Sequence, residues 1–152
     1  MLVYEILGDH SSTARVFRNV VDCQRSEDGK SLTQVCKWTF SVFSGSFTLK
    51  LAVDKNPAQR CIAFTILESS FMKGFEGRWQ VSRLEGSEQG ETCLVEHELS
   101  MKPLVPVPPP ISYYTKSVLE KEVMTVLTDL QMEVQHQMEL LSSPPRDQGE
   151  QQ

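Results

Sequence analysis

A long stretch of alternating apolar and polar residues constrains the fold of this chain more than any other feature. Between Val20 and Met101, apolar side chains recur at every second position in several consecutive segments. A period of two is the spacing of a β-strand, whose neighbouring side chains point to opposite faces. Short turn sequences separate the segments, and short connections join antiparallel strands. The pattern therefore predicts a curved antiparallel sheet of about six strands, with one apolar and one polar face.

Each strand of this predicted sheet contributes large side chains to the apolar face. We place turns at Ser44–Ser46, Asp54–Pro57 and residues 85–91, where glycine, proline, asparagine and serine cluster. The residues between these turns that we expect to face the interior include Trp38, Phe40, Phe47, Phe64, Trp79, His97 and Leu99.

The second strong signal is a long helix near the C-terminus. Apolar residues follow a spacing of three and four from Leu119 to Leu141, and the charged residues lie largely off this stripe. We expect the helix to begin near Ile111, because five prolines in 102–110 cannot continue a sheet. At 1.5 Å per residue, a helix of ~30 residues spans roughly 45 Å.

These signals predict one α+β domain over residues 1–141, followed by a disordered tail at 142–152. Two short helices, Leu2–Leu7 and Ala14–Val20, are expected before the sheet. One long helix covers only part of a wide curved sheet, so we expect an apolar cavity between them. From the helix, its lining would be Val123, Leu127 and Leu130. In the alternative interpretation, the aromatic side chains meet and fill this space.

Composition limits the classes of function. The net charge is −5 and the basic residues are scattered, without the basic stripe of a nucleic-acid-binding protein. The longest strongly apolar run, Cys61–Leu67, is far shorter than the ~20 residues of a transmembrane helix. The four cysteines form no CxxC pair, which argues against a zinc site and favours reduced thiols in a soluble intracellular protein.

Several motifs are similar, in their order, to those of one known superfamily. Lys73–Trp79 (KGFEGRW) is similar to an F-x-G-x-W strand, Thr92–Leu99 to the last strand, and Tyr4–Asp9 to the first helix. Pro103 and Pro106 are similar to the approach to a long helix. Together they resemble the START-like superfamily, also called the polyketide cyclase/lipid transport or helix-grip superfamily, and within it the coenzyme-Q-binding-like branch.

The resemblance implies a lipid, an isoprenoid quinone or a polyketide-like compound as ligand, and by its branch a plastid or mitochondrial location. It also implies a strand before the first helix, for which this chain offers no residues. We therefore expect an exposed sheet edge and some tendency to self-associate, because unpaired strands invite pairing with another chain.

The predicted site is a ligand cavity without a catalytic centre. His97 would either orient a ligand or be satisfied by a neighbouring group, since an unpaired polar group is costly to bury. No Ser/His/Asp constellation, phosphate loop or dinucleotide motif occurs, so we predict no catalytic residue, metal or cofactor. We therefore predict the binding or transport of an apolar small molecule. The alternatives are a co-chaperone-like interaction scaffold with a filled core and, third in order, a cyclase or aromatase.

Overall fold

The computed structural model of this chain describes residues 1–40, 43–86, 92–104 and 109–143. The side chains at 40, 43 and 109–115 lie outside this description. The elements in chain order are α1 (Leu2–Gly8), the 3₁₀ turn η1 (His10–Ser12), α2 (Thr13–Val16), β1 (Val20–Arg25), β2 (Ser31–Phe40), β3 (Phe43–Asn56), β4 (Cys61–Ser69), β5 (Met72–Arg83), β6 (Cys93–Pro103) and α3 (Pro109–Ser142).

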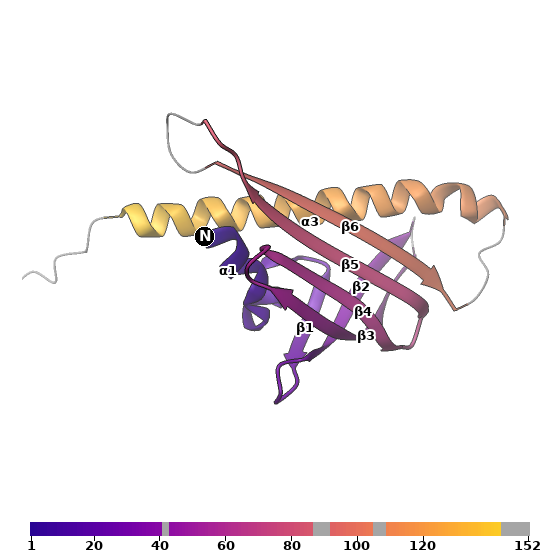
Figure 1. The fold of residues 1–152 in the computed structure, drawn as a ribbon. Coiled ribbons are helices and arrows are strands. Elements are labelled where there is room, and N and C mark those ends of the chain that lie inside the picture. Colours follow the sequence, from indigo (N-terminus) through magenta and orange to yellow (C-terminus); the bar gives the residue numbers. More distant parts are fainter. Residues whose placement is uncertain (41–42, 87–91, 105–108, 144–152) are drawn as a thin grey trace, which may run out of the picture.

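The six strands form one sheet in the order of the sequence, and each neighbouring pair is antiparallel (Figure 1). The predicted α+β architecture and meander are therefore confirmed. The register also confirms which side chains share one face of the sheet, because Ile62 pairs with Trp79, which pairs in turn with His97. Residues directly opposite in a sheet share a face, so these three side chains lie on the concave, apolar side.

The turn predicted at Ser44–Ser46 is wrong. These residues are paired within β3, where Gly45 lies opposite Trp38 of β2. A Cβ atom at position 45 would lie 2.8 Å from Nε1 of Trp38, closer than side chains tolerate. The glycine therefore makes room for the indole ring rather than for a turn, and local composition alone does not separate these two uses.

The second predicted helix is shorter than expected. It ends at Val16, and Phe17 is already extended, with φ −101° and ψ 114°. The ring of Phe17 stacks on that of Trp79, with ring centroids 6.2 Å apart. Packing against the sheet thus ends the helix before residue 20. Upstream, the carboxylate of Asp9 accepts a hydrogen bond from the backbone N–H of Ser11, which caps the 3₁₀ turn.

The C-terminal half of α3 packs with α1 over one end of the concave face, and Figure 1 shows the N-terminus beside this half of the helix. Leu130 is 3% exposed there, whereas Met138 and Leu141 are 57% and 76% exposed, although the sequence pattern placed all three on one stripe. The last turns of α3 therefore leave the apolar interior. We call the buried group at this end the helix-side cluster: Val3, Leu7, Ile62, Trp79, Val81 and Leu130.

The other end of the concave face has a core of its own. We call it the sheet-side cluster: Phe47, Leu49, Leu51 and Met72. Among the side chains that the structure describes, the hydrophobic residues packed against it all come from β2, β4, β5 and β6. Phe64 of β4 packs against both clusters and so joins the two ends of the interior.

Acidic side chains of α3 tie the helix to residues 15–19, which lead from the end of α2 to β1. Asp129 and Glu133 were expected off the buried stripe, but they are 7% and 8% exposed. Glu133 forms a two-point ion pair with Arg15, at 2.7 and 3.0 Å. The remaining bonds join Asp129 to the backbone N–H and guanidinium of Arg18, and Glu122 to the side-chain amide of Asn19. Charge-assisted bonds thus complement apolar packing at this seam.

The two ends of the sheet are β1 and β6, each paired on one side only among the described strands. The predicted tail at 142–152 lies outside the described residues, apart from Ser142 at the end of α3 and Ser143 after it. In the described part of the chain, no helix is long and apolar enough to cross a membrane.

Candidate functional site

Four of the predicted cavity residues meet at the helix-side cluster. Trp79 and Leu130 are buried members of it, and Phe64 and Leu127 are half-buried against it. Val123 is half-buried one turn earlier on α3. At this end the structure therefore brings the predicted residues together as a packed core.

Three apolar side chains converge over Gly77 in the middle of the concave face. A Cβ atom at this position would lie 3.7 Å from Phe64, 3.7 Å from Phe75 and 3.9 Å from Leu99. Phe75 and Leu99 are half-buried. Gly77 thus forms a floor on which aromatic and aliphatic side chains meet, beside the sheet-side cluster that contains the predicted residue Phe47.

The structure places Trp38 differently from the other predicted residues. It is 36% exposed and its indole stacks on Phe71, with ring centroids 6.4 Å apart and an angle of 9° between the rings. The ring centroid of Phe71 in turn lies 5.7 Å from that of Phe47. These three rings form a partly exposed aromatic stack at the sheet-side end. Phe40 lies in β2, but its side chain is outside the described residues.

His97 lies on the concave face, half-buried, with its ring stacked on Trp79 at a centroid distance of 3.9 Å. Its Nδ1 lies 3.1 Å from the carbonyl oxygen of Arg78. A carbonyl can only accept, so Nδ1 carries the proton and donates. Burial lowers the pKa of His97, which favours the neutral ring. In this tautomer Nε2 is a hydrogen-bond acceptor, suited to a donor such as a ligand hydroxyl.

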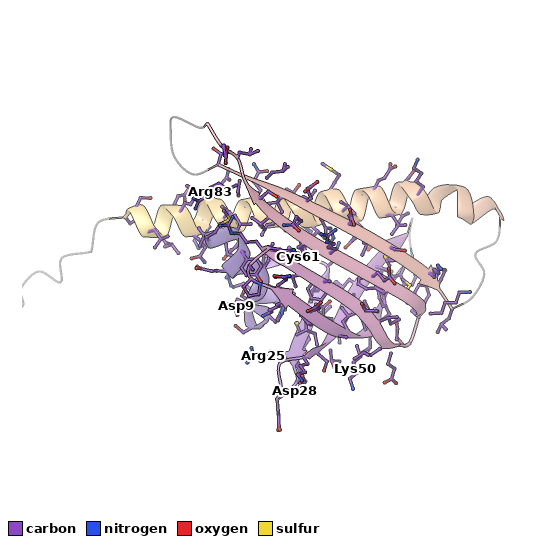
Figure 2. All side chains as sticks on the ribbon, in the orientation of Figure 1. Asp9, Arg25, Asp28, Lys50, Cys61 and Arg83 are labelled. Carbon is purple, nitrogen blue, oxygen red and sulfur yellow. The ribbon has the colours of Figure 1, made fainter. Side chains whose placement is uncertain are left out.

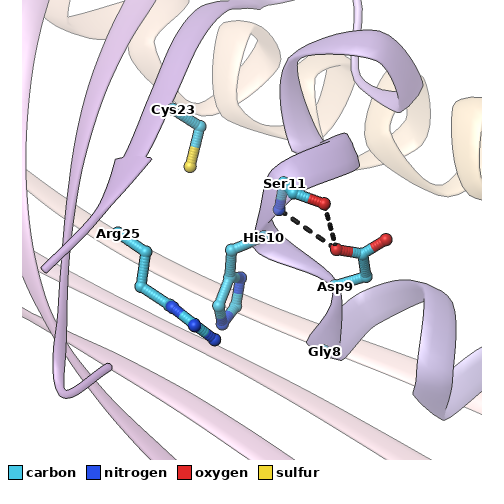
Figure 3. A pocket seen from close by; sticks show the side chains of 6 residues that line it. All are labelled: Gly8, Asp9, His10, Ser11, Cys23 and Arg25. Carbon is cyan, nitrogen blue, oxygen red and sulfur yellow. Dashed lines mark hydrogen bonds between the residues drawn. The ribbon is translucent and has the colours of Figure 1, made fainter. Parts of the chain in front are cut away.

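A hollow of about 350 Å³ lies between the α1–η1 turn and β1, and none of the predicted cavity residues lines it. His10 lies between the two short helices predicted from the sequence, yet it is 4% exposed and its ring packs edge-on against Phe64, with centroids 6.1 Å apart. Within the described structure, the buried Nε2 of His10 has no hydrogen-bond partner. Figure 3 shows the lining: Gly8, Asp9, His10, Ser11, Cys23 and Arg25.

The charges around this hollow are mainly positive. Burial, followed by the nearby cations Lys55 and Arg25, lowers the pKa of His10 to about 4. Lys55 donates to the carbonyl oxygen of Gly8 at 2.9 Å. Among the described residues, neither cation has a carboxylate within salt-bridge distance. His10 is therefore a neutral, unpartnered donor or acceptor beside two cations that form no salt bridge in the described structure.

A second hollow, of about 180 Å³, follows the seam between α1 and α3. Its walls include Glu133 and Arg15, which already pair with each other. It is lined by Leu2, Glu5, Ile6, Asp9, Ser12, Arg15, Glu133 and Gln137. Because this central ion pair is satisfied within the protein, we assign the hollow to the seam that holds α3.

The described residues contain no group of three metal-ligating side chains, and the four cysteines are unpaired. Burial raises the pKa of the Cys36 thiol to about 12, with nearby Glu122 acting in the same direction. Burial likewise raises the pKa of Cys23. These two thiols are thus protonated at neutral pH and poor nucleophiles, because the thiolate is the reactive form.

A curved antiparallel meander with a long C-terminal helix and short N-terminal helices defines the START-like, helix-grip class of proteins. The sequence profile of the family described as polyketide cyclase / dehydrase and lipid transport matches residues 1–131. The chain therefore belongs to this family, as the motifs at Tyr4–Asp9, Lys73–Trp79 and Thr92–Leu99 predicted. A comparison with curated protein sequences gives no match.

Solved structures share this fold at low sequence identity. A START superfamily protein from Mycobacterium smegmatis is 18% identical with a TM-score of 0.70, and the match covers 89% of this chain and 88% of that one. The Zhui aromatase/cyclase from Streptomyces sp. R1128 is 19% identical with a TM-score of 0.69, covering 94% and 90%. A protein from Thermus thermophilus is 16% identical with a TM-score of 0.69, covering 93% and 90%. These likenesses concern the fold.

Proposed function

We propose that this protein binds or transports a hydrophobic small molecule between the concave face of the sheet and α3. The ligand classes we favour are a lipid, an isoprenoid quinone or a polyketide-like compound. The observation that carries the proposal is that different elements pack the two ends of the interior. The helix-side end is packed by α1 and α3, while the apolar floor at the sheet-side end is packed, among the described side chains, by sheet residues.

The floor at the sheet-side end suits an apolar ligand chemically. Phe75, Leu99 and Met101 are half-buried there, and the aromatic stack of Trp38, Phe71 and Phe47 borders it. Covering half-buried apolar surface with a ligand removes it from water, which contributes about 25 cal/mol for each Å². A ligand of drug-like size gains most of its binding free energy from such walls, and a few polar groups fix its orientation.

His97 is the polar group that we expect to orient the ligand. Its Nδ1–H is engaged by the carbonyl of Arg78, so the neutral ring offers an acceptor at Nε2. A ligand hydroxyl fits this acceptor, whereas a ligand carbonyl does not. A purely structural histidine would make the same hydrogen bond, so this bond does not distinguish a structural role from ligand orientation. Substitution of His97 distinguishes them.

Two other functions have their own support. The dense packing of Trp79, Ile62 and Leu130 favours an interaction scaffold with a filled core. The likeness to an aromatase/cyclase favours a cyclase, although its support is the fold alone. Neither alternative predicts that a neutral apolar compound is retained by the purified protein.

Native mass spectrometry of gently purified protein tests the proposal, followed by titration with the neutral probe 1-decanol. Leu99→Phe adds bulk over Gly77, where the apolar side chains converge, and should weaken decanol binding because it occupies the proposed space. Leu94→Phe is the matched control, since Leu94 lies on the same strand and is 46% exposed on the other face.

The expected result is a retained apolar molecule and a loss of decanol affinity in Leu99→Phe alone, with unchanged circular dichroism in both variants. His97→Leu should reduce affinity for a hydroxylated ligand more than it changes the melting temperature. Absence of any retained molecule, together with no decanol binding by the unmodified protein, would refute the ligand-binding function and favour the filled scaffold.

A further inference from the structure

From the hollow at the α1–η1 turn we infer a subsite for an oxyanion: it receives the carboxylate or phosphate head of an amphipathic ligand, with Arg25 and Lys55 supplying charge and His10 an inner hydrogen bond. This inference rests on the proposed binding of an apolar ligand and specifies its chemical class. It follows from three features of the hollow, namely an unpartnered buried imidazole, two cations without a salt bridge in the described structure, and contact with the apolar interior.

His10 is the first feature. An unpaired polar atom is costly to bury in a protein interior, so such atoms nearly always have partners. Nε2 of His10 has none in the described structure, although the side chain is 4% exposed and lines the hollow. An oxyanion here can accept a hydrogen bond from Nε2–H, which satisfies the orphaned atom.

The second feature is the pair of cations. Figure 3 shows the Arg25 and His10 side chains pointing toward one another, and Lys55 lies close enough to lower the pKa of His10. Arg25 is exposed and, among the described residues, its side chain forms neither a hydrogen bond nor an ion pair. Its planar guanidinium can therefore pair in a two-point fashion with a carboxylate or phosphate without breaking an existing contact.

Asp9, the acid that lines the hollow, opposes these charges only in part. The carboxylate of Asp9 accepts hydrogen bonds from the backbone N–H of Ser11 at 3.2 Å and from its hydroxyl at 2.5 Å. These bonds lower the pKa of Asp9 and hold the carboxylate toward Ser11, on the side away from Arg25 (Figure 3). The part of the hollow between His10 and Arg25 thus keeps its positive character.

Contact with the interior selects an amphipathic ligand over a free anion. The ring of His10 packs against Phe64, and Phe64 packs against both the helix-side and the sheet-side cluster. A head group bound at His10 therefore lies at the margin of the apolar interior. The hollow of about 350 Å³ accommodates the head and the first part of a chain, and the rest would follow Phe64 along the concave face.

The test compares decanoate, 1-decanol, acetate and inorganic phosphate by calorimetry at neutral pH, below micelle-forming concentrations. Arg25→Gln removes the exposed charge and should weaken decanoate binding about tenfold, because hydrogen bonds to charged groups are among the stronger ones. Arg25→Lys should retain most of the affinity. The control is Lys50→Gln, which removes a charge from β3 on the face of the sheet opposite to that of Arg25 (both cations are labelled in Figure 2), and should change affinity less than about twofold.

Binding of decanoate that depends on Arg25, with decanol unaffected by the same change, supports the inference. Acetate or phosphate binding as tightly as decanoate, with the same dependence on Arg25, overturns it in favour of a small-anion site. Equal binding of decanoate and decanol in the unmodified protein and in Arg25→Gln also overturns it, but leaves the proposed function intact. If neither decyl compound binds, the proposed function and the subsite fail together.

Discussion

Replacing Leu130 with alanine tests how α3 is held on the sheet. Leu130 is 3% exposed and packs with Ile62, Trp79 and Val81 of the sheet and with residues of α1. The change deletes three carbon atoms, which at about 0.8 kcal/mol for each buried carbon amounts to about 2.4 kcal/mol. The cavity left behind adds to this, because the surrounding groups come from three different elements and relax only in part. We therefore expect a loss of about 3–4 kcal/mol in the free energy of unfolding.

Urea unfolding followed by circular dichroism measures this loss. With a slope of about 2 kcal/mol per M, the midpoint should fall by about 1.5–2 M. Leu141→Ala is the matched control on the same helix, because Leu141 is 76% exposed and its truncation should change stability by less than about 0.5 kcal/mol. Leu127→Ala should lower the free energy of unfolding by an intermediate amount, because Leu127 is half-buried. Equal shifts for Leu130→Ala and Leu141→Ala would refute the described packing of α3.

Three further predictions concern charge and the sheet edge. Burial, Lys55 and Arg25 hold the pKa of His10 at about 4, with Asp9 opposing them, so the unfolded chain takes up a proton below pH 6.5 before the folded protein does. Stability should therefore be complete well above pH 6.5 and fall by about 3 kcal/mol toward pH 4, a loss that is absent in His10→Gln and visible in urea unfolding at several pH values. Arg18→Ala should lower Tm in differential scanning calorimetry far more than Lys116→Ala. The first change leaves the buried carboxylate of Asp129 without its guanidinium partner, whereas the second breaks an exposed ion pair. Equal effects on Tm would contradict the described contact between α3 and Arg18. Sedimentation velocity should detect self-association at high protein concentration and less of it in Leu94→Lys, which places a charge on the edge strand β6; a strictly monomeric protein would contradict this prediction.

The fold was predictable because its main signals are local. Alternation along β4 and β5 assigns Ile62, Trp79 and Val81 to one face, and the register of the sheet bears this out. Short connections then leave the meander as the simplest topology. The wrong turn prediction at Gly45 shows the limit of reading local sequence, because glycine occurs both in turns and at close side-chain contacts. Only the position of Trp38, opposite Gly45 on the neighbouring strand, distinguishes the two cases.

The charged parts of the interior were not predictable in the same way. Asp129 and Glu133 look like solvent-facing residues in a helical pattern, and their burial depends on Arg18 and Arg15, which lie 111 and 118 residues earlier in the sequence. His10 likewise gave no signal, because its burial arises only when the 3₁₀ turn folds against β4. These contacts join residues that are far apart in the sequence, so the periodicity of one segment does not predict them.

The contact between Gly45 and Trp38 constrains how the sequence can change over time. Any side chain at position 45 places its Cβ within 2.9 Å of three atoms of the indole, so a single substitution there displaces the ring and its stack with Phe71. A smaller residue at position 38 removes this conflict. The two positions should therefore vary together among homologous sequences, with glycine at 45 wherever tryptophan stands at 38 and larger residues at 45 only where the indole has been lost.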